Sequence, residues 1–215
     1  MGKFVVLPLS AALLLGMCAR ANDREEQGTR SLTLQAFDQL EVASALSVTV
    51  HLGEAARGEI RGRAGEIEKV QVRQEGGRLM LDLGRGADLK GGIEIELWTT
   101  SLKELELSGA TRADVGGLAA EELDLDVSGA GHAILKGHVG HLTLDLSGAA
   151  SLEARECRID RAEVDLSGAS QAELTVLKEL SADCSGASQL DYWGQPVMKS
   201  LDSSGASSVR SRDAR

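Results

Sequence analysis

Apolar and acidic residues alternate in short runs that recur through the second half of the chain. The runs Leu105-Glu106-Leu107, Leu125-Asp126-Val127, Leu144-Asp145-Leu146 and Val164-Asp165-Leu166 have the period of two that is typical of a strand with one buried face. The alternation resumes after a short break, as in Ala113-Asp114-Val115. The pattern therefore predicts two strands in each repeat, and no helical period competes with it.

A Ser-Gly-Ala phrase follows each of these runs and sets the length of the repeat. Its six copies start 18 to 20 residues apart, at Ser108, Ser128, Ser147, Ser167, Ser185 and Ser204. A fixed period near 20 is the mark of a solenoid, in which each repeat is one coil stacked on its neighbours. The unit reads as strand, tight corner, strand and looser return, so the fold class is all-β, a parallel β-helix with about 19–20 residues per coil.

The glycine of each phrase is predicted to form the corner of the coil. Glycine permits backbone angles that are closed to other residues and lets a corner be tight; the corner glycines are Gly109, Gly129, Gly148, Gly168, Gly186 and Gly205. We expect the alanine to fit a narrow interior edge and the serine hydroxyls to bond within the stack. A catalytic serine would not occur six times without a base beside it, so this column is structural.

The β-helix domain is expected to span residues 31–209. Leu40-Glu41-Val42-Ala43-Ser44-Ala45 aligns with Leu105-Glu106-Leu107-Ser108-Gly109-Ala110, which predicts degenerate coils over 31–104 and regular coils over 105–209. Gly76-Gly77 predicts a turn between two strands. We expect Tyr192-Trp193 to cover the end of the coil, and residues 210–215 to form a polar tail.

The N-terminus has the features of an export signal. Lys3 precedes the apolar run from Phe4 to Leu15, which is too short to span a bilayer, and Ala19-Arg20-Ala21 fits the small-x-small cleavage rule. This predicts a signal peptide over 1–21 and a flexible lead-in over 22–30, with no membrane span in the mature chain. The alternative is a lipid anchor at Cys18, although Met17 is larger than the residue that usually precedes such a cysteine.

Composition limits the residue types that can form the core and the kinds of partner that the protein can bind. Aromatic residues make up 2% of the chain, so the core must be built from stacked Leu, Val, Ile and Ala. The formal net charge of −10 argues against nucleic acid and anionic lipid surfaces, because phosphate binding needs Lys and Arg on one face.

One column of carboxylates is the strongest candidate for chemistry. Each lies two residues before the serine of a phrase, and because the next residue faces inward these side chains face outward: Glu106, Asp126, Asp145, Asp165, Asp183 and Asp202. Stacked like charges are destabilising. Solvation and hydrogen bonds can offset the repulsion, and so can bound Ca²⁺, which favours clustered carboxylate oxygens. We expect the solvated face and keep a cation stripe as the alternative.

No catalytic, cofactor or other metal site is predicted. His132, His138 and His141 lie close together in the sequence, but nothing completes a metal set of known spacing, so we interpret them as surface residues. Cys157 aligns with Leu118 and Leu177, and Cys184 aligns with Leu166. Both cysteines are therefore predicted to lie in the core, in different columns, without a disulfide.

The repeated Leu-Asp-Leu-Ser-Gly-Ala segments resemble the putative autotransporter adhesin, head GIN domain family of bacterial envelope proteins. Phe37-Asp38-Gln39-Leu40-Glu41-Val42 is also similar to that family, and the resemblance covers about Ser31 to Val209. It implies a right-handed β-helix similar in shape to pectate lyases, export to the periplasm, outer membrane or cell exterior, a role in adhesion and no known catalytic residues.

The sequence bears on three classes of function. The sequence favours a non-catalytic envelope protein that uses its flat faces for adhesion or as a scaffold and binds an envelope protein or a glycan. The alternative is a β-helix that binds or degrades polysaccharide, but such an enzyme needs a local cluster of different groups, whereas here the same polar residues recur in every coil. A left-handed hexapeptide acyltransferase is not supported by a period near 19.

Overall fold

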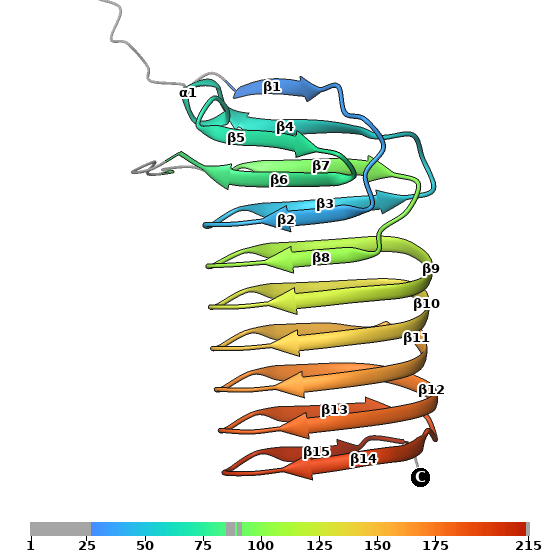
Figure 1. The fold of residues 1–215 in the computed structure, drawn as a ribbon. Coiled ribbons are helices and arrows are strands. Elements are labelled where there is room, and N and C mark those ends of the chain that lie inside the picture. The colour runs from blue at the N-terminus through green and yellow to red at the C-terminus, as the bar shows by residue number, and fades with distance from the viewer. Residues whose placement is uncertain (1–26, 85–88, 90–91, 214–215) are drawn as a thin grey trace, which may run out of the picture.

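The computed structural model describes residues 27–84, 89 and 92–213. It is a right-handed β-solenoid of about 5 turns with 67% of its residues in strands, and its coils stack along one axis (Figure 1). The predicted β-helix is confirmed. The predicted signal peptide, the alternative anchor at Cys18 and most of the predicted lead-in lie outside the described residues.

The C-terminal two-thirds of the stack is regular. After β8 (Glu104–Leu107), each of four long strands starts beyond one corner and ends at the next: β9 (Arg112–Val127), β10 (His132–Leu146), β11 (Ser151–Leu166) and β12 (Gln171–Cys184). These strands pair in parallel. The sequence predicts two strands joined by a looser return, but the ladder continues round the bend, with shifts of register near Gly137 in β10 and between Ala154 and Arg161 in β11. The return is therefore part of one bent strand.

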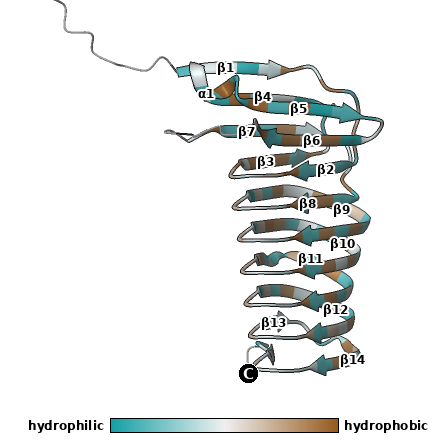
Figure 2. Ribbon diagram, turned by 60° about the vertical axis from the view of Figure 1, so that its left-hand side comes forward, coloured by the Kyte–Doolittle hydropathy of each residue, from teal (hydrophilic) through white to brown (hydrophobic). Residues whose placement is uncertain are grey.

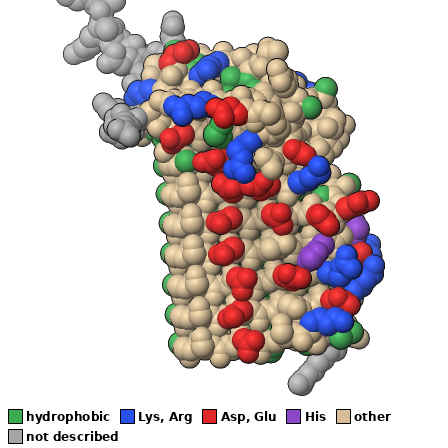
Figure 3. Space-filling view, in the orientation of Figure 1, with side chains coloured by type: hydrophobic (Ala, Val, Ile, Leu, Met, Phe, Trp, Pro, Cys, Tyr) green, Lys and Arg blue, Asp and Glu red, His purple; other side chains and the backbone are tan. Residues whose placement is uncertain are grey.

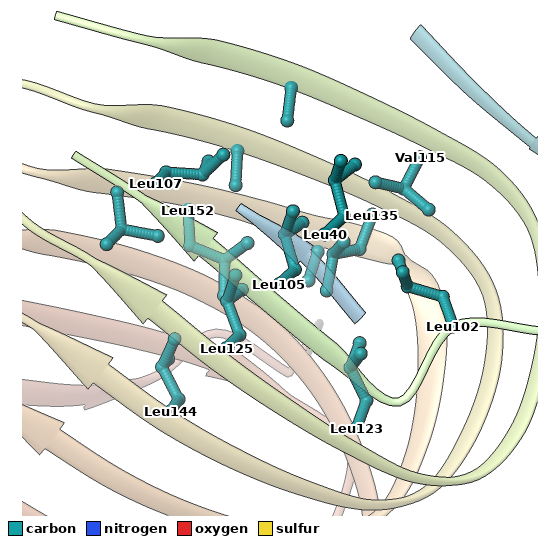
Figure 4. Packing of buried hydrophobic residues seen from close by; sticks show 14 of the residues in the cluster. Leu40, Leu102, Leu105, Leu107, Val115, Leu123, Leu125, Leu135, Leu144 and Leu152 are labelled. Carbon is teal, nitrogen blue, oxygen red and sulfur yellow. The ribbon is translucent and has the colours of Figure 1, made fainter. Parts of the chain in front are cut away.

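The core is a set of apolar rows that run the length of the solenoid. Hydrophobic and hydrophilic residues alternate along the strands (Figure 2), and the inward residues are almost fully buried. Leu105, Leu125 and Leu144 occupy one row on successive coils (Figure 4). Burying a side chain of this size stabilises the fold by roughly 1.5–3 kcal/mol, so the rows supply the stability that aromatic side chains provide in other small domains.

The degenerate coil predicted near residue 40 is confirmed. β2 (Gln39–Val42) pairs in parallel with β8, and β3 (Ser47–Leu52) pairs in parallel with β9. Ser44 occupies the corner position of this coil and adopts a φ of 72°. It is the non-glycine counterpart of Gly109.

The rest of the N-terminal region departs from the expected run of coils. β6 (Arg78–Leu83) and β7 (Glu94–Thr99) form one further coil, but it stacks on the other side of β2 and β3. Three strands and one short helix extend the stack beyond it: β1 (Gln27–Leu32), β4 (Arg57–Arg63), α1 (Ala64–Ile67) and β5 (Val70–Glu75). These three strands pair antiparallel.

The reversal between β5 and β6 follows from the turn at Gly76-Gly77, which the sequence correctly predicts. A two-residue turn can join only antiparallel neighbours, and Glu75 pairs with Arg78 across it. Residues 57–75 are therefore an antiparallel cap rather than degenerate coils.

Both predicted ends of the domain shift outward. β1 starts at Gln27, within the predicted lead-in, and pairs with β4. At the other end β13 (Gln189–Trp193), β14 (Val197–Ser203) and β15 (Ser208–Ser211) complete the stack, so Arg210 and Ser211 belong to a strand rather than to the tail. Within the described part of the chain, no helix is long and apolar enough to cross a membrane.

Candidate functional site

The acidic column exists as an in-register ladder on one face. Glu106 pairs with Asp126, and the register continues through Asp145, Asp165, Asp183 and Asp202, one carboxylate on each coil. Glu41 of the degenerate coil pairs with Glu106 and extends the ladder in the N-terminal direction. Figure 3 shows these side chains as a column of acidic groups along the face.

Two members of the column, Asp126 and Asp165, have pKa values above the usual value of an aspartate. Partial burial, followed by the charges of Asp145 and Glu106, raises the pKa of Asp126 above its usual value. The same causes, burial and then the charges of Asp145 and Asp183 with that of Glu163, raise the pKa of Asp165. Neighbouring carboxylates therefore repel one another even where water reaches them.

A single arginine compensates the N-terminal end of the column. Arg78 contacts Glu104 at 2.5 Å, Glu106 at 3.0 Å and Glu41 at 3.6 Å. The pKa of Glu106 is lowered by its hydrogen bonds with Glu104 and Arg78. The pKa of Glu104 is raised, chiefly because its hydrogen bond with Glu106 favours a proton on Glu104.

The column does not converge on one point. Strands lie about 4.8 Å apart, so each level presents a carboxylate beside one neighbour above and one below. Ca²⁺ takes 6–8 oxygen ligands, and within the described ranges no group of three or more His, Cys, Asp or Glu side chains could hold a metal ion. The geometry supplies a linear stripe of charge.

The corner glycines bring successive coils close together. All six have a φ between 73° and 86°, a region that favours glycine. The carbonyl of each corner glycine except Gly205 accepts a hydrogen bond from the alanine N–H of the next corner, as Gly129 does from Ala149 at 2.7 Å. A Cβ on Gly148 would lie 2.6 Å from that same oxygen. The corner therefore needs glycine twice, for its φ and for the close contact.

The alanine of the phrase does not face the interior, which corrects the expectation from sequence. Ala110, Ala130 and Ala149 are exposed, and the residue after each is buried, because the left-handed glycine interrupts the alternation. Sequence reasoning missed this buried row, although all its members are small: Thr111, Gly131, Ala150, Ser170 and Ser188. Three of the phrase serines bond within the stack as expected: the hydroxyls of Ser128, Ser167 and Ser185 each donate to a carbonyl of the preceding coil.

The three histidines do not form a cluster. Each faces an acid on the next coil: His132 lies 3.4 Å from Glu153, His138 lies 3.6 Å from Asp160, and His141 lies 3.5 Å from Glu163. His138 is exposed as predicted. The His132 side chain is only 22% exposed and contacts the Ser151 hydroxyl through Nδ1, so it is more buried than a surface residue.

Two adjoining hollows lie along the edge where the strands bend, and both include residues 119–122. The first, about 380 Å³, is lined by Leu52, Leu102 and Leu118 among others, and the second, about 500 Å³, by Glu122, His138, Asp160 and Arg161. The sequence signal for them is the loss of alternation around Gly116-Gly117 and Gly140. The second hollow brings carboxylates, an imidazole and a guanidinium together.

Both cysteines are buried as the sequence predicts, but Cys157 is not in register with Leu177, because Arg158 pairs with Thr175 and Ile159 pairs with Val176. Cys157 and Cys184 are buried free thiols, and burial raises the pKa of Cys157 to about 12. The aromatic pair does not cover the end of the coil, which corrects that prediction. β15 stacks outside β13 and pairs Ser211 with Tyr192, while Trp193 lies under the guanidinium of Arg155, 4.5 Å from the ring centre.

Comparison with known proteins gives a family and a fold. The model of a family described as "Putative auto-transporter adhesin, head GIN domain" matches residues 36–196. A putative adhesin from Bacteroides fragilis is 17% identical, with a TM-score of 0.73 over 87% of this chain and 97% of that one. No protein of curated function matches the chain.

Two structures from Parabacteroides share the fold at lower similarity. A putative adhesin from Parabacteroides merdae is 14% identical with a TM-score of 0.52, and a putative lipid binding protein from Parabacteroides distasonis is 15% identical with a TM-score of 0.52. In each case the match covers 87% of this chain and 97% of the other.

Proposed function

Because the chain belongs to the putative auto-transporter adhesin, head GIN domain family, we propose that it is a non-catalytic protein exported to the cell envelope, where its long faces bind an envelope protein or a glycan. The observation that carries the proposal is the repetition of a carboxylate at the same position of successive coils, in the in-register column from Glu106 to Asp202. Repetition of this kind suits an extended binding surface, since the column presents a carboxylate at each of its levels.

The second of the two hollows at the edge favours the alternative function, in which the protein binds or degrades polysaccharide. It brings Glu122, His138, Asp160 and Arg161 together, and paired carboxylates are the groups that hydrolyse glycosides. A general acid, however, needs a raised pKa. The pKa of Asp160 is lowered, chiefly by a hydrogen bond from Lys178. Asp160 is therefore poorly suited to act as a general acid.

Catalysis is tested by incubating the purified protein with neutral and acidic polysaccharides. We expect retention of glycan without new reducing ends or unsaturated products. Product formation that is abolished by Asp160→Asn would contradict the non-catalytic assignment. Glu153→Gln, on the face opposite the acidic column, is the matched control.

Binding through a face is tested with two pairs of charge reversals. Asp145→Lys with Asp165→Lys alters the acidic column, and Glu153→Lys with Glu173→Lys alters the opposite face. We expect one pair to abolish binding to envelope fractions or immobilised glycans and the other to leave it unchanged. Binding that survives both pairs would exclude the faces.

Export is tested on the protein isolated from its native cells. Mass spectrometry should find a mature N-terminus at Asn22 in an envelope or extracellular fraction. A diacylated Cys18 terminus would instead identify a lipoprotein.

A further inference from the structure

The two ends of the stack are built differently. At the N-terminal end α1 lies against β1 and β4 and buries Ile67. At the C-terminal end β14 pairs with β12, and β15 pairs with β13. Across the described residues neither β14 nor β15 has a strand on its other side (Figure 1). Unpaired edges of this kind are templates for pairing with another strand.

Exposed apolar side chains gather on the same end strand. Val197 is 62% exposed, Met198 37% and Leu201 50%. Met198 pairs with the buried Leu180, and Leu201 pairs with the buried Ala182. These two residues therefore continue interior rows that the end of the stack leaves open.

We propose that two copies of this chain form a dimer through this end, with β14 of each copy pairing antiparallel with β15 of its partner. A partner that binds this end must present two strand edges, separated by the thickness of one coil, and an open apolar row between them. The same end of a second copy presents both. A twofold axis along the strand direction places β14 of one copy beside β15 of the other on both faces, and closes the assembly at two copies.

The charges on this end select that arrangement. If Leu201 lies opposite the partner's Val209, both residues face the interior, and Asp202 lies diagonal to the partner's Arg210. Each dimer then gains two opposite-charge contacts. If β14 instead paired with the partner's β14, with Leu201 opposite the partner's Leu201, Asp202 would lie diagonal to the partner's Asp202. Like charges on neighbouring strands are destabilising.

A head-to-tail stack is disfavoured for a separate reason. No large hydrophobic side chain is exposed among the described residues of the N-terminal cap, so the apolar row at the C-terminal end would have no counterpart there. A head-to-tail contact would also repeat without closing and would give filaments.

The test is sedimentation equilibrium of the purified protein. We expect twice the mass of the chain, and Leu201→Asp should raise the dissociation constant at least about tenfold. Ile134→Asp is the matched control, because Ile134 is a half-buried outward residue in the middle of the stack. This variant should remain a dimer, and the melting temperatures of both variants show that the fold is intact.

The pairing of β14 with β15 is tested by charge exchange. Asp202→Arg and Arg210→Asp should each weaken the dimer by roughly tenfold, since two cross-strand pairs are affected, and the double variant should recover most of the affinity. A monomer at every concentration, filaments, a dimer that Leu201→Asp leaves intact, or a double variant no stronger than the single variants would overturn the proposal.

Discussion

Arg78 donates a hydrogen bond of 3.0 Å from Nη1 to Oε1 of Glu106, the first carboxylate of the acidic column. The contact passes over β2, which lies between β6 and β8 and contributes Glu41 to the same arginine. One cation from the inserted coil therefore compensates three acids at the point where the regular coils begin.

Replacing Arg78 with Met should destabilise the protein by about 1 kcal/mol at low salt, because partly exposed charge-assisted bonds are worth more than isolated surface pairs but are still screened. The loss should shrink in high salt. Arg73→Met is the control, since Arg73 donates to the neutral Gln71. Equal losses in urea unfolding would show that the charge of Arg78 contributes nothing.

Gly148→Ala should cost at least about twice as much stability as Gly53→Ala. Gly53 has a φ of +98° and open space around it, so its variant carries backbone strain of roughly 1–3 kcal/mol. Gly148 adds the contact of 2.6 Å with the Gly129 carbonyl. Thermal unfolding measures both, with the milder Asp145→Asn as a reference. If the two glycine variants lose the same stability, the close contact is not a constraint.

The acidic column should act as a passive surface. Sodium chloride should then stabilise the protein slightly, because salt screens repulsion over a Debye length of about 8 Å, and Ca²⁺ should match Mg²⁺ at equal ionic strength. The measurement is melting temperature in EDTA, NaCl, MgCl₂ and CaCl₂. A rise specific to Ca²⁺ that disappears in Asp145→Asn with Asp165→Asn would make the column a cation site.

The raised pKa values of Asp126 and Asp165 predict a dependence on pH with a defined sign. A carboxyl whose pKa is higher in the folded than in the unfolded state destabilises the fold above both values, and this loss disappears as the pH falls towards the unfolded value near 3.8. Asp126→Asn and Asp165→Asn should each add a few tenths of a kcal/mol at pH 7, since exposed groups are screened, and nothing below pH 3.8.

Asp160→Asn should change the stability of the fold in the opposite direction. The pKa of Asp160 is lowered in the fold, so its contribution is present above the unfolded value and is lost as the pH falls through the folded value. This variant should be less stable at pH 7 and no different at low pH. Unfolding curves that move in the same direction for both types of variant would refute the assignment.

Cys157 and Cys184 should resist thiol reagents in the native protein. The thiolate is the reactive form, and burial raises the pKa of both groups, that of Cys157 to about 12. Peptide mapping after maleimide treatment should find both unlabelled until denaturant is added. Labelling in native buffer would place either thiol at the surface.

The sequence alone determined the regular part of the fold. A period of 18 to 20 residues and an alternation of two specify both the coil and the side of the sheet that each residue faces, because register in a solenoid repeats from neighbour to neighbour. The register of the acidic column, the coil at Leu40 and the buried cysteines follow from this rule. The outward alanine of each corner does not, because a left-handed glycine shifts the alternation by one residue.

Tertiary structure decided whatever depends on contacts that do not repeat. β6 and β7 stack on the far side of β2 and β3, an order that no period encodes, and only this order brings Arg78 to Glu106. The edge hollows and the apolar row at the C-terminal end arise in the same way. Each depends on which coil is next to which, and a local pattern specifies a residue's face without specifying its neighbour.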